Sequence, residues 1–147
     1  YNTIHALVDY DVIPIINEND ALAVDEIKVG DNDTLAALLV PVVNADLLVL
    51  VSDIDGLYDK NPKLYDDAIL LNDIEFITDE IEQMATGSST NLGTGGMATK
   101  IKAAKIVTDF GKHQIIVNGS KDNYILDILI LFQKNVNRIL ALIESEC

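Results

Sequence analysis

A glycine-rich segment that leads into a lysine-bearing helix is the part of this sequence best suited to chemistry. Residues 93–100 read Gly-Thr-Gly-Gly-Met-Ala-Thr-Lys. A helix start offers unpaired backbone N–H groups and the positive end of the helix dipole, and glycines let the backbone come close to an anion. The predicted helix and the residues just after it carry four lysines, Lys100, Lys102, Lys105 and Lys112, in a chain whose formal net charge is -14. The segment therefore predicts a local cationic patch that binds a phosphate-bearing ligand.

Four polar loops supply carboxylates and amides. Residues 17–20, 52–58 and 118–120 each follow an expected strand, and residues 30–33 lead into an expected helix. In open α/β sheets, ligands bind outside the carboxyl ends of the strands. Phosphoryl transfer depends mostly on positioning and charge neutralisation, which lysine, aspartate and magnesium provide. Together the loops and the glycine-rich segment predict a site that holds a phosphoryl donor and a polar acceptor.

Each loop taken by itself also has a purely structural interpretation. Asp and Asn in tight loops are most often turn formers or helix N-caps, at roughly two chances in three for any one motif. Asp33 would then cap a helix that begins at Thr34, and Lys100 would be an ordinary solvated lysine. His5 and His113 have no partner at metal-ligand spacing, so no protein metal site is predicted.

The elements that must position these loops are short apolar runs alternating with segments of helical period. This alternation predicts an α/β fold with a mostly parallel sheet. In the expected strand at 46–52, the five residues 47–51 are all apolar, as a strand covered on both faces requires. We also expect Pro41 to kink its helix, Gly111 to end one, and the Asn118-Gly119 pair to turn the chain with positive φ. The expected strands are 12–16, 46–52, 68–71 and 114–117, and the expected helices are 33–45, 78–85 and 97–110.

Composition limits the class of protein. The 147 residues are 49% hydrophobic, which is enough for one domain with a real core. The sequence has neither an apolar run long enough for a membrane span nor a secretory signal, so a soluble intracellular protein is expected. The single cysteine, Cys147, cannot form an internal disulfide. The acidic balance, with a pI near 4.2, argues against a nucleic-acid-binding surface.

The last part of the sequence has a different pattern. From Ile125 onward, apolar residues recur at spacings of four and three, which predicts a helix laid on the domain or on a partner. The residues of this seam are Ile125, Leu129, Phe132, Val136, Ile139 and Ile143. We therefore divide the chain into a domain at 1–124 and a helical tail at 125–147.

The loops resemble the glutamate 5-kinase branch of the amino acid kinase family. The resemblance is carried by residues 15–20 (Ile-Ile-Asn-Glu-Asn-Asp), 30–33 (Gly-Asp-Asn-Asp), 52–58 (Ser-Asp-Ile-Asp-Gly-Leu-Tyr) and 93–100. It covers about residues 1–120, and the order and separations of the motifs also match. The resemblance implies a three-layer α/β/α sandwich, of which this chain is the nucleotide-binding, C-terminal half of the kinase domain. Family members begin with a strand, a glycine-rich loop carrying a lysine and a serine-containing loop, and this sequence starts past all three.

The resemblance also implies roles for individual residues. Asp20 and Asn32 would hold the glutamate substrate, Asp33 would orient catalytic lysines, and Lys100 would stabilise the transferring phosphoryl group. The residues implied to contact the nucleotide are Ser52, Asp53, Thr94, Gly95, Gly96, Met97, Ala98, Thr99 and Lys100.

The implied reaction is the ATP- and Mg²⁺-dependent phosphorylation of the side-chain carboxylate of L-glutamate, toward proline. A cytoplasmic homo-oligomer with proline as a feedback inhibitor is implied as well. Three alternatives stay open: another amino acid kinase with a different acceptor, a non-catalytic fragment that binds nucleotide or proline, and a remnant of a broken gene.

Overall fold

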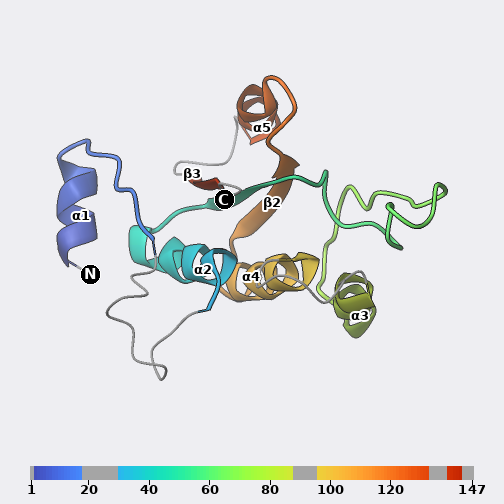
Figure 1. The fold of residues 1–147 in the computed structure, drawn as a ribbon. Helices are drawn as coiled ribbons and strands as arrows, with labels where there is room; N and C mark the ends of the chain where they lie inside the picture. Colours follow the sequence, from blue (N-terminus) through green and yellow to red (C-terminus); the bar gives the residue numbers. More distant parts are fainter. Residues whose placement is uncertain (1, 18–29, 88–95, 133–138, 144–147) are drawn as a thin grey trace.

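Five helices and three strands make up the described parts of the chain, residues 2–17, 30–87, 96–132 and 139–143 of a computed structural model (Figure 1). The helices are α1 (Asn2–Asp9), α2 (Asn32–Val43), α3 (Asp79–Gly87), α4 (Met97–Asp109) and α5 (Tyr124–Phe132). The strands are β1 (Leu47–Ser52), β2 (His113–Asn118) and β3 (Ile139–Ile143). One or two helices separate each strand from the next along the chain, in agreement with the α/β pattern of the sequence.

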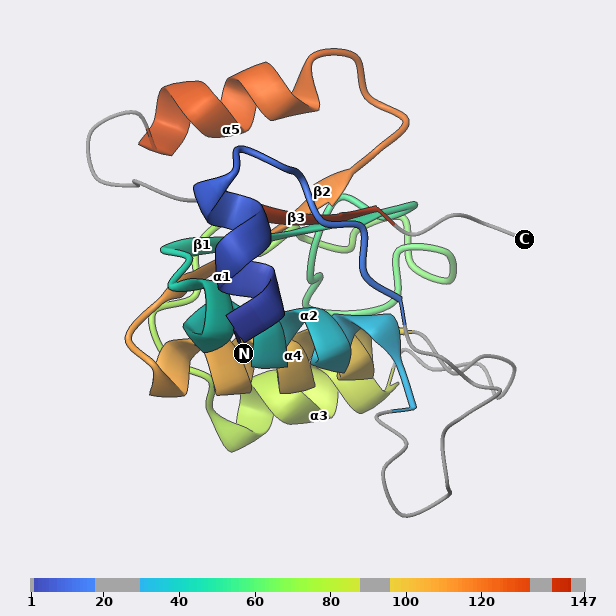
Figure 2. The same ribbon diagram turned by 90° about the vertical axis from the view of Figure 1, so that its left-hand side faces the viewer.

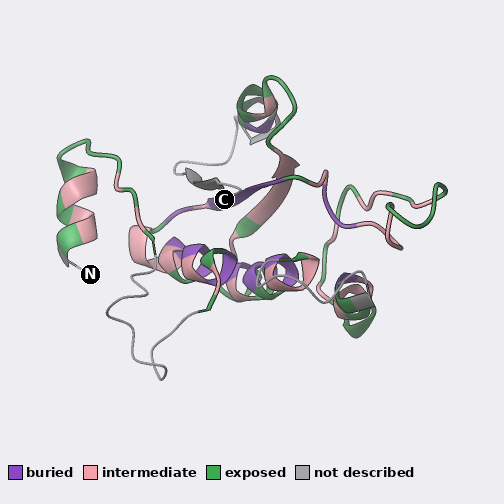
Figure 3. Ribbon diagram, in the orientation of Figure 1, coloured by how far each residue is buried: buried purple, intermediate pink, exposed green. Residues whose placement is uncertain are grey.

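The three strands form a parallel sheet in the order β2-β1-β3. Leu47 pairs with His113 of β2 and with Ile139 of β3, and the pairing continues in register along β1. All six residues of β1 are buried (Figure 3). The central position of β1 explains its uninterrupted apolar sequence, because a strand covered on both faces has no solvent side.

Helices cover both faces of this sheet (Figures 1 and 2). Alternate residues of β1 point to opposite faces, so Leu48 and Leu50 pack with Val40 of α2 and Val107 of α4. On the other face, Leu47, Val49 and Val51 of β1 meet Ile128 of α5. The described residues therefore form an α/β fold with α2 and α4 on one side of a parallel sheet and α5 on the other.

A third apolar cluster joins α3 to the outer side of α4. Ala85 of α3 packs with Ile101 of α4 and with Leu57 from the loop after β1. Thr78 caps α3, since its hydroxyl accepts the Ile81 N–H at 3.4 Å. At the far end of α4, Gly111 has φ +67°, a value that favours glycine. The expected helix start at Thr78 and stop at Gly111 are both confirmed.

The prediction of a strand at 12–16 is wrong. These residues are irregular; Val12, Ile13 and Ile15 are exposed, and Ile13 and Ile15 retain 88% and 98% of their accessible surface. A strand needs a neighbour, and β1 already has β2 on one side and β3 on the other. Local apolar composition favoured a strand, but the sheet holds no described partner for one here.

The expected strand at 68–71 is reduced to one antiparallel bridge between Tyr58 and Leu70. The expected helical tail is also wrong in part, because α5 ends at Phe132 and residues 139–143 form β3.

The chain turns after Asn118 without positive φ at Asn118 or Gly119. Glycine is required at 119 for another reason, since a Cβ there would lie 2.6 Å from Val51 Cγ1. Pro41 lies within the last turn of α2, two residues before the helix ends.

Within the described ranges, no helix combines the length and the apolar composition needed to cross a membrane.

Candidate active site

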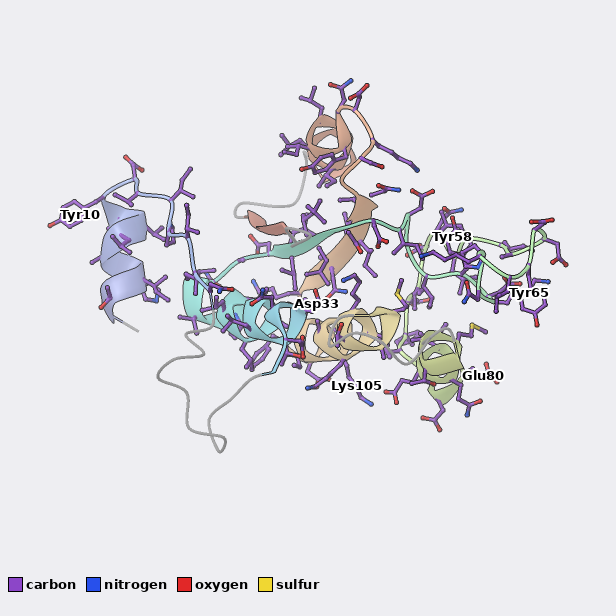
Figure 4. The ribbon with its side chains drawn as sticks, viewed as in Figure 1. Tyr10, Asp33, Tyr58, Tyr65, Glu80 and Lys105 are labelled. Atoms are coloured by element: carbon purple, nitrogen blue, oxygen red, sulfur yellow. The ribbon has the colours of Figure 1, made fainter. Side chains whose placement is uncertain are left out.

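The starts of α2 and α4 meet in a buried ion pair. Asp33 is the second residue of α2 and Lys100 is the fourth residue of α4, and Lys100 Nζ lies 3.2 Å from Asp33 Oδ2. The two side chains retain only 4% and 1% of their accessible surface. Figure 4 shows Asp33 at the point where α2 lies beside α4. Two residues 67 positions apart in sequence are therefore joined by the packing of two helices on one face of the sheet.

Thr99 connects this pair to the glycine-rich segment. Its hydroxyl donates to Asp33 Oδ2 at 2.6 Å and accepts the backbone N–H of Gly96 at 3.2 Å. The end of the glycine-rich segment, the first turn of α4 and Asp33 are thus linked through one hydroxyl group. This linkage fixes the backbone that would approach a phosphate.

The cap of α2 is Asp31, not Asp33. The Asp31 carboxylate accepts the backbone N–H of Thr34 at 2.6 Å and its hydroxyl at 2.8 Å. The interpretation of Asp33 as an N-cap is therefore wrong. Capping by Asp31 leaves Asp33 to pair with Lys100, and Asp33 Oδ1 is buried with no hydrogen-bond partner among the described residues. Leaving a buried acceptor unpaired costs free energy, so Asp33 Oδ1 is well placed to accept a hydrogen bond from a further donor.

Lys100 is also not the solvated lysine of the structural interpretation, because it is buried against Asp33. Two other lysines of the region, Lys105 and Lys112, have carboxylate partners as well, whereas Lys102 is exposed. Lys105 pairs with Glu82 of α3, which holds the pKa of Lys105 above its ordinary value, and Lys112 pairs with Asp46 at 2.9 Å. The expected cationic patch is therefore largely neutralised by its neighbours.

A second polar network ties together the loops after β1 and β2, at the carboxyl edge of the sheet. Asp55 accepts from Asn118 Nδ2 at 3.0 Å and pairs with Lys121 Nζ at 2.8 Å. These two partners lower the pKa of Asp55, with the Lys121 hydrogen bond as the largest cause. The backbone N–H of Gly119 also donates to the Ser52 carbonyl at 2.9 Å. The network fixes the loop that follows Ser52 and carries Asp53.

Sequence reasoning treated residues 118–120 as a strand-end loop and gave Asp55, Asn118 and Lys121 no role of their own. Their positions at or after the ends of two expected strands could have indicated that they lie close together, because parallel strands end at one edge of the sheet. Two predicted nucleotide contacts lie at the end of β1 and just after it. Ser52 is buried, Asp53 is exposed, and Ser52 Oγ lies 3.3 Å from Asp53 Oδ1.

The remaining predicted residues divide into two sets. Asn32 is exposed at the first position of α2, and Gly96, Met97 and Ala98 lie at the start of α4. Asp20, Thr94 and Gly95 lie outside the described residues. The described residues contain no group of three or more side chains that could hold a metal ion.

Beside the first turns of α4 is a hollow of about 250 Å³. Its floor is apolar, and its rim carries charged side chains from α3 and α4, where Figure 4 labels Lys105. The lining residues are Glu82, Ala85, Thr86, Ala98, Ile101, Lys102 and Lys105.

A parallel sheet between helices, with a lysine and an aspartate joined at two helix starts, agrees with the family to which the chain belongs. Residues 1–118 match the amino acid kinase family, and the chain is a member of that family.

Within this family, the chain is similar to proteins named glutamate 5-kinase. It is 56% identical over 128 residues to the one from Alkaliphilus metalliredigens and 58% identical over 128 residues to the one from Clostridium tetani. In both comparisons the match takes in 87% of this chain and 48% of the relative. The relative from Thermoanaerobacter sp. is 52% identical over 126 residues, which are 86% of this chain and 34% of that protein. The chain therefore spans about half the length, or less, of the curated relatives it matches.

Proposed function

We propose that this chain is the nucleotide-binding part of a glutamate 5-kinase, which transfers a phosphoryl group from ATP to the side-chain carboxylate of L-glutamate. Identity of 50–58% to proteins of that name supports the reaction. The buried pair of Asp33 and Lys100 at the starts of α2 and α4 is the observation that supports it most directly.

Lys100 has the chemistry that the transferring group requires. A phosphoryl group in transfer carries charge on its equatorial oxygens, and a lysine at the start of a helix neutralises that charge together with the backbone N–H groups. The hydrogen bonds of Asp33 to Lys100 and Thr99 hold the ammonium group in place. The acceptor carboxylate is already ionised at neutral pH, so the reaction needs no strong general base.

Asp20 and Asn32 are proposed to hold glutamate, and Ser52, Asp53 and residues 94–100 to contact the nucleotide. Magnesium in kinases is bound by one or two carboxylates and the substrate phosphates. The exposed carboxylate of Asp53, at the end of β1, fits that role. When bound, the ion would neutralise charge on the donor phosphates. A cytoplasmic location, a homo-oligomer and inhibition by proline complete the proposal.

The proposal is tested in a chimaera that supplies the part of the Clostridium tetani relative that this chain does not match. ADP release is measured with Mg-ATP and L-glutamate, and L-aspartate, acetylglutamate and carbamate serve as competing acceptors. We expect L-glutamate to be the preferred acceptor. Lys100→Met should lower kcat by about two to three orders of magnitude, as for loss of one charge-stabilising group. Lys102→Met, on an exposed lysine of the same helix, is the matched control and should change kcat by less than about twofold.

Each contrary outcome has a distinct meaning. Preference for another acceptor would assign the chain to a different amino acid kinase. Retained Mg-ATP or proline binding without ADP release would indicate a non-catalytic binding fragment. Equal effects of the two lysine variants would remove Lys100 from the reaction.

A further inference from the structure

We propose that residues 12–16 can pair as a strand with the same edge of β1 that β3 now occupies. Two segments of this chain would then compete for one position in the sheet. The proposal rests on strand pairing and does not depend on the proposed reaction.

The first observation is the exposure of residues 12–16. Their sequence is Val-Ile-Pro-Ile-Ile, and Val12, Ile13 and Ile15 retain 45%, 88% and 98% of their accessible surface. Tyr10, just before them, is 80% exposed, and Figure 4 shows it projecting away from the sheet. Soluble proteins rarely leave a contiguous apolar run in water, and β-branched composition favours a strand. The segment therefore has the composition of a strand and no described place in the sheet.

The second observation is the origin of the two neighbours of β1. The family match ends at residue 118, so β2 (His113–Asn118) lies inside it and β3 (Ile139–Ile143) lies outside it. Within the described part of the family-matched region, β1 thus has a neighbour on one side only. The other side is covered by a strand from the tail.

The third observation is the position of α2. A helix that connects two parallel strands packs over the pair that it connects. α2 follows residues 12–16 in sequence and precedes β1, and it contacts both β1 and β3 (Figure 2). It therefore lies over the edge that residues 12–16 would take as the first strand of a strand-helix-strand unit. β3 is parallel to β1 over five residues, which is the length and direction of strand that the unit requires.

Pro14 is compatible with that place. Proline lacks a backbone N–H, so it is tolerated in an edge strand where that group would face away from the sheet. In the exchanged form, residues 12–16 would be an edge strand, as β3 is now. Asn17 would then follow a strand at the carboxyl edge of the sheet, as the residues after Ser52 and Asn118 do.

Hydrogen exchange of the complete 147-residue chain tests the proposal. In the unmodified chain, the paired amides of residues 139–143 should exchange at least about tenfold more slowly than those of Ile13 and Ile15, whereas the Val12 N–H already donates to the Leu7 carbonyl at 2.9 Å. Proline is then introduced at two adjacent positions in separate variants, Leu140→Pro and Ala141→Pro. Adjacent N–H groups of a strand point to opposite sides, so one variant removes a hydrogen bond to β1 and the other is its matched control.

In the variant that releases β3, we expect the amides of Ile13 and Ile15, which point to the side opposite that of Pro14, to become protected by about tenfold while β1 and β2 stay protected. Adding Ile13→Asp and Ile15→Asp to that variant should abolish the new protection, since charged side chains cannot enter the covered sheet. Amides of Ile13 and Ile15 that stay unprotected while β1 and β2 remain protected would overturn the proposal.

A second measurement covers the case in which both proline variants unfold. A synthetic peptide with the sequence of residues 9–17 is added to the unmodified chain, and a scrambled peptide is the control. The proposal predicts that the native peptide raises the exchange rate of residues 139–143 in a concentration-dependent way. Equal effects of the two peptides, or no effect of either up to the solubility limit, would overturn it.

Discussion

At the scale of single residues, the buried charges of Asp33 and Lys100 are each compatible with a stable fold only while the other charge is present. Breaking a buried ion pair by removing one partner leaves an uncompensated charge, and this typically costs about 3–5 kcal/mol. We expect Lys100→Met to lower the free energy of unfolding by about that amount, because the Asp33 carboxylate is 1% exposed and loses its ammonium partner. Urea unfolding at pH 7 measures the change.

The matched control is the double variant Asp33→Asn with Lys100→Met, which removes the stranded charge. It should recover most of the lost stability. A double variant less stable than Lys100→Met would contradict this account of the pair. The stability measurement is also needed to interpret the kinetic effect of Lys100→Met, since loss of folded protein and loss of kcat are different results.

Asp55 gives a prediction for pH dependence. Lys121 and Asn118 hold the pKa of folded Asp55 below its ordinary value of 3.8. A carboxylate with a lowered folded pKa stabilises the protein above the unfolded pKa, and this contribution is lost as pH falls through the folded pKa. We expect Asp55→Asn to be less stable than the unmodified chain at pH 7, with the difference shrinking below about pH 4.

Thermal unfolding of both chains between pH 7 and pH 3 measures this difference. Lys121 is 61% exposed, so added salt should reduce the difference at pH 7. A stability difference that grows on acidification would show that Asp55 does not act through its charged form.

At the scale of elements, the close approach of the β2 loop to β1 depends on Gly119. A Cβ at this position would lie 2.6 Å from Val51 Cγ1, inside the buried strand. We expect Gly119→Ala to destabilise the fold by about 1–3 kcal/mol, as for overpacking in a core. Urea unfolding measures the cost.

The control for this prediction is a double-mutant cycle with Val51→Ala, which removes the methyl group that the new Cβ would meet. In the Val51→Ala background, Gly119→Ala should cost much less, so that the two substitutions are coupled. Additive effects would mean that the contact between residues 51 and 119 is not the cause.

At the scale of the whole molecule, the formal net charge of -14 on 147 residues is unfavourable for a compact state. Raising the salt concentration from 0.01 to 0.15 M shortens the screening length from about 30 Å to about 8 Å. We expect Tm to rise over this range, because screening weakens the repulsion among many carboxylates more than it weakens a few partly exposed ion pairs. Scans in NaCl and KCl separate screening from binding of a specific ion, and a fall of Tm in both salts would contradict the prediction.

The sequence by itself determined the order of the central helices and strands and the loops that surround the site. The apolar run of β1, the periodic segments of α2, α3 and α4, and the glycine at 111 are local signals, and each has a local structural consequence. The motif at residues 93–100 also identified the helix start that carries Lys100. The ammonium group of Lys100 and the carboxylate of Asp33 could be named as a pair only through family resemblance, since no local pattern joins residues 67 positions apart.

Only the tertiary structure decided which groups are paired and which strands are in the sheet. It assigned the α2 cap to Asp31, buried Asp33 with Lys100, and gave Lys105 and Lys112 carboxylate partners. It also placed β3 of the tail beside β1 and left residues 12–16 exposed. Side-chain pairing and strand pairing are contacts between distant parts of the chain, so local composition limits the candidates and packing around a shared core selects among them.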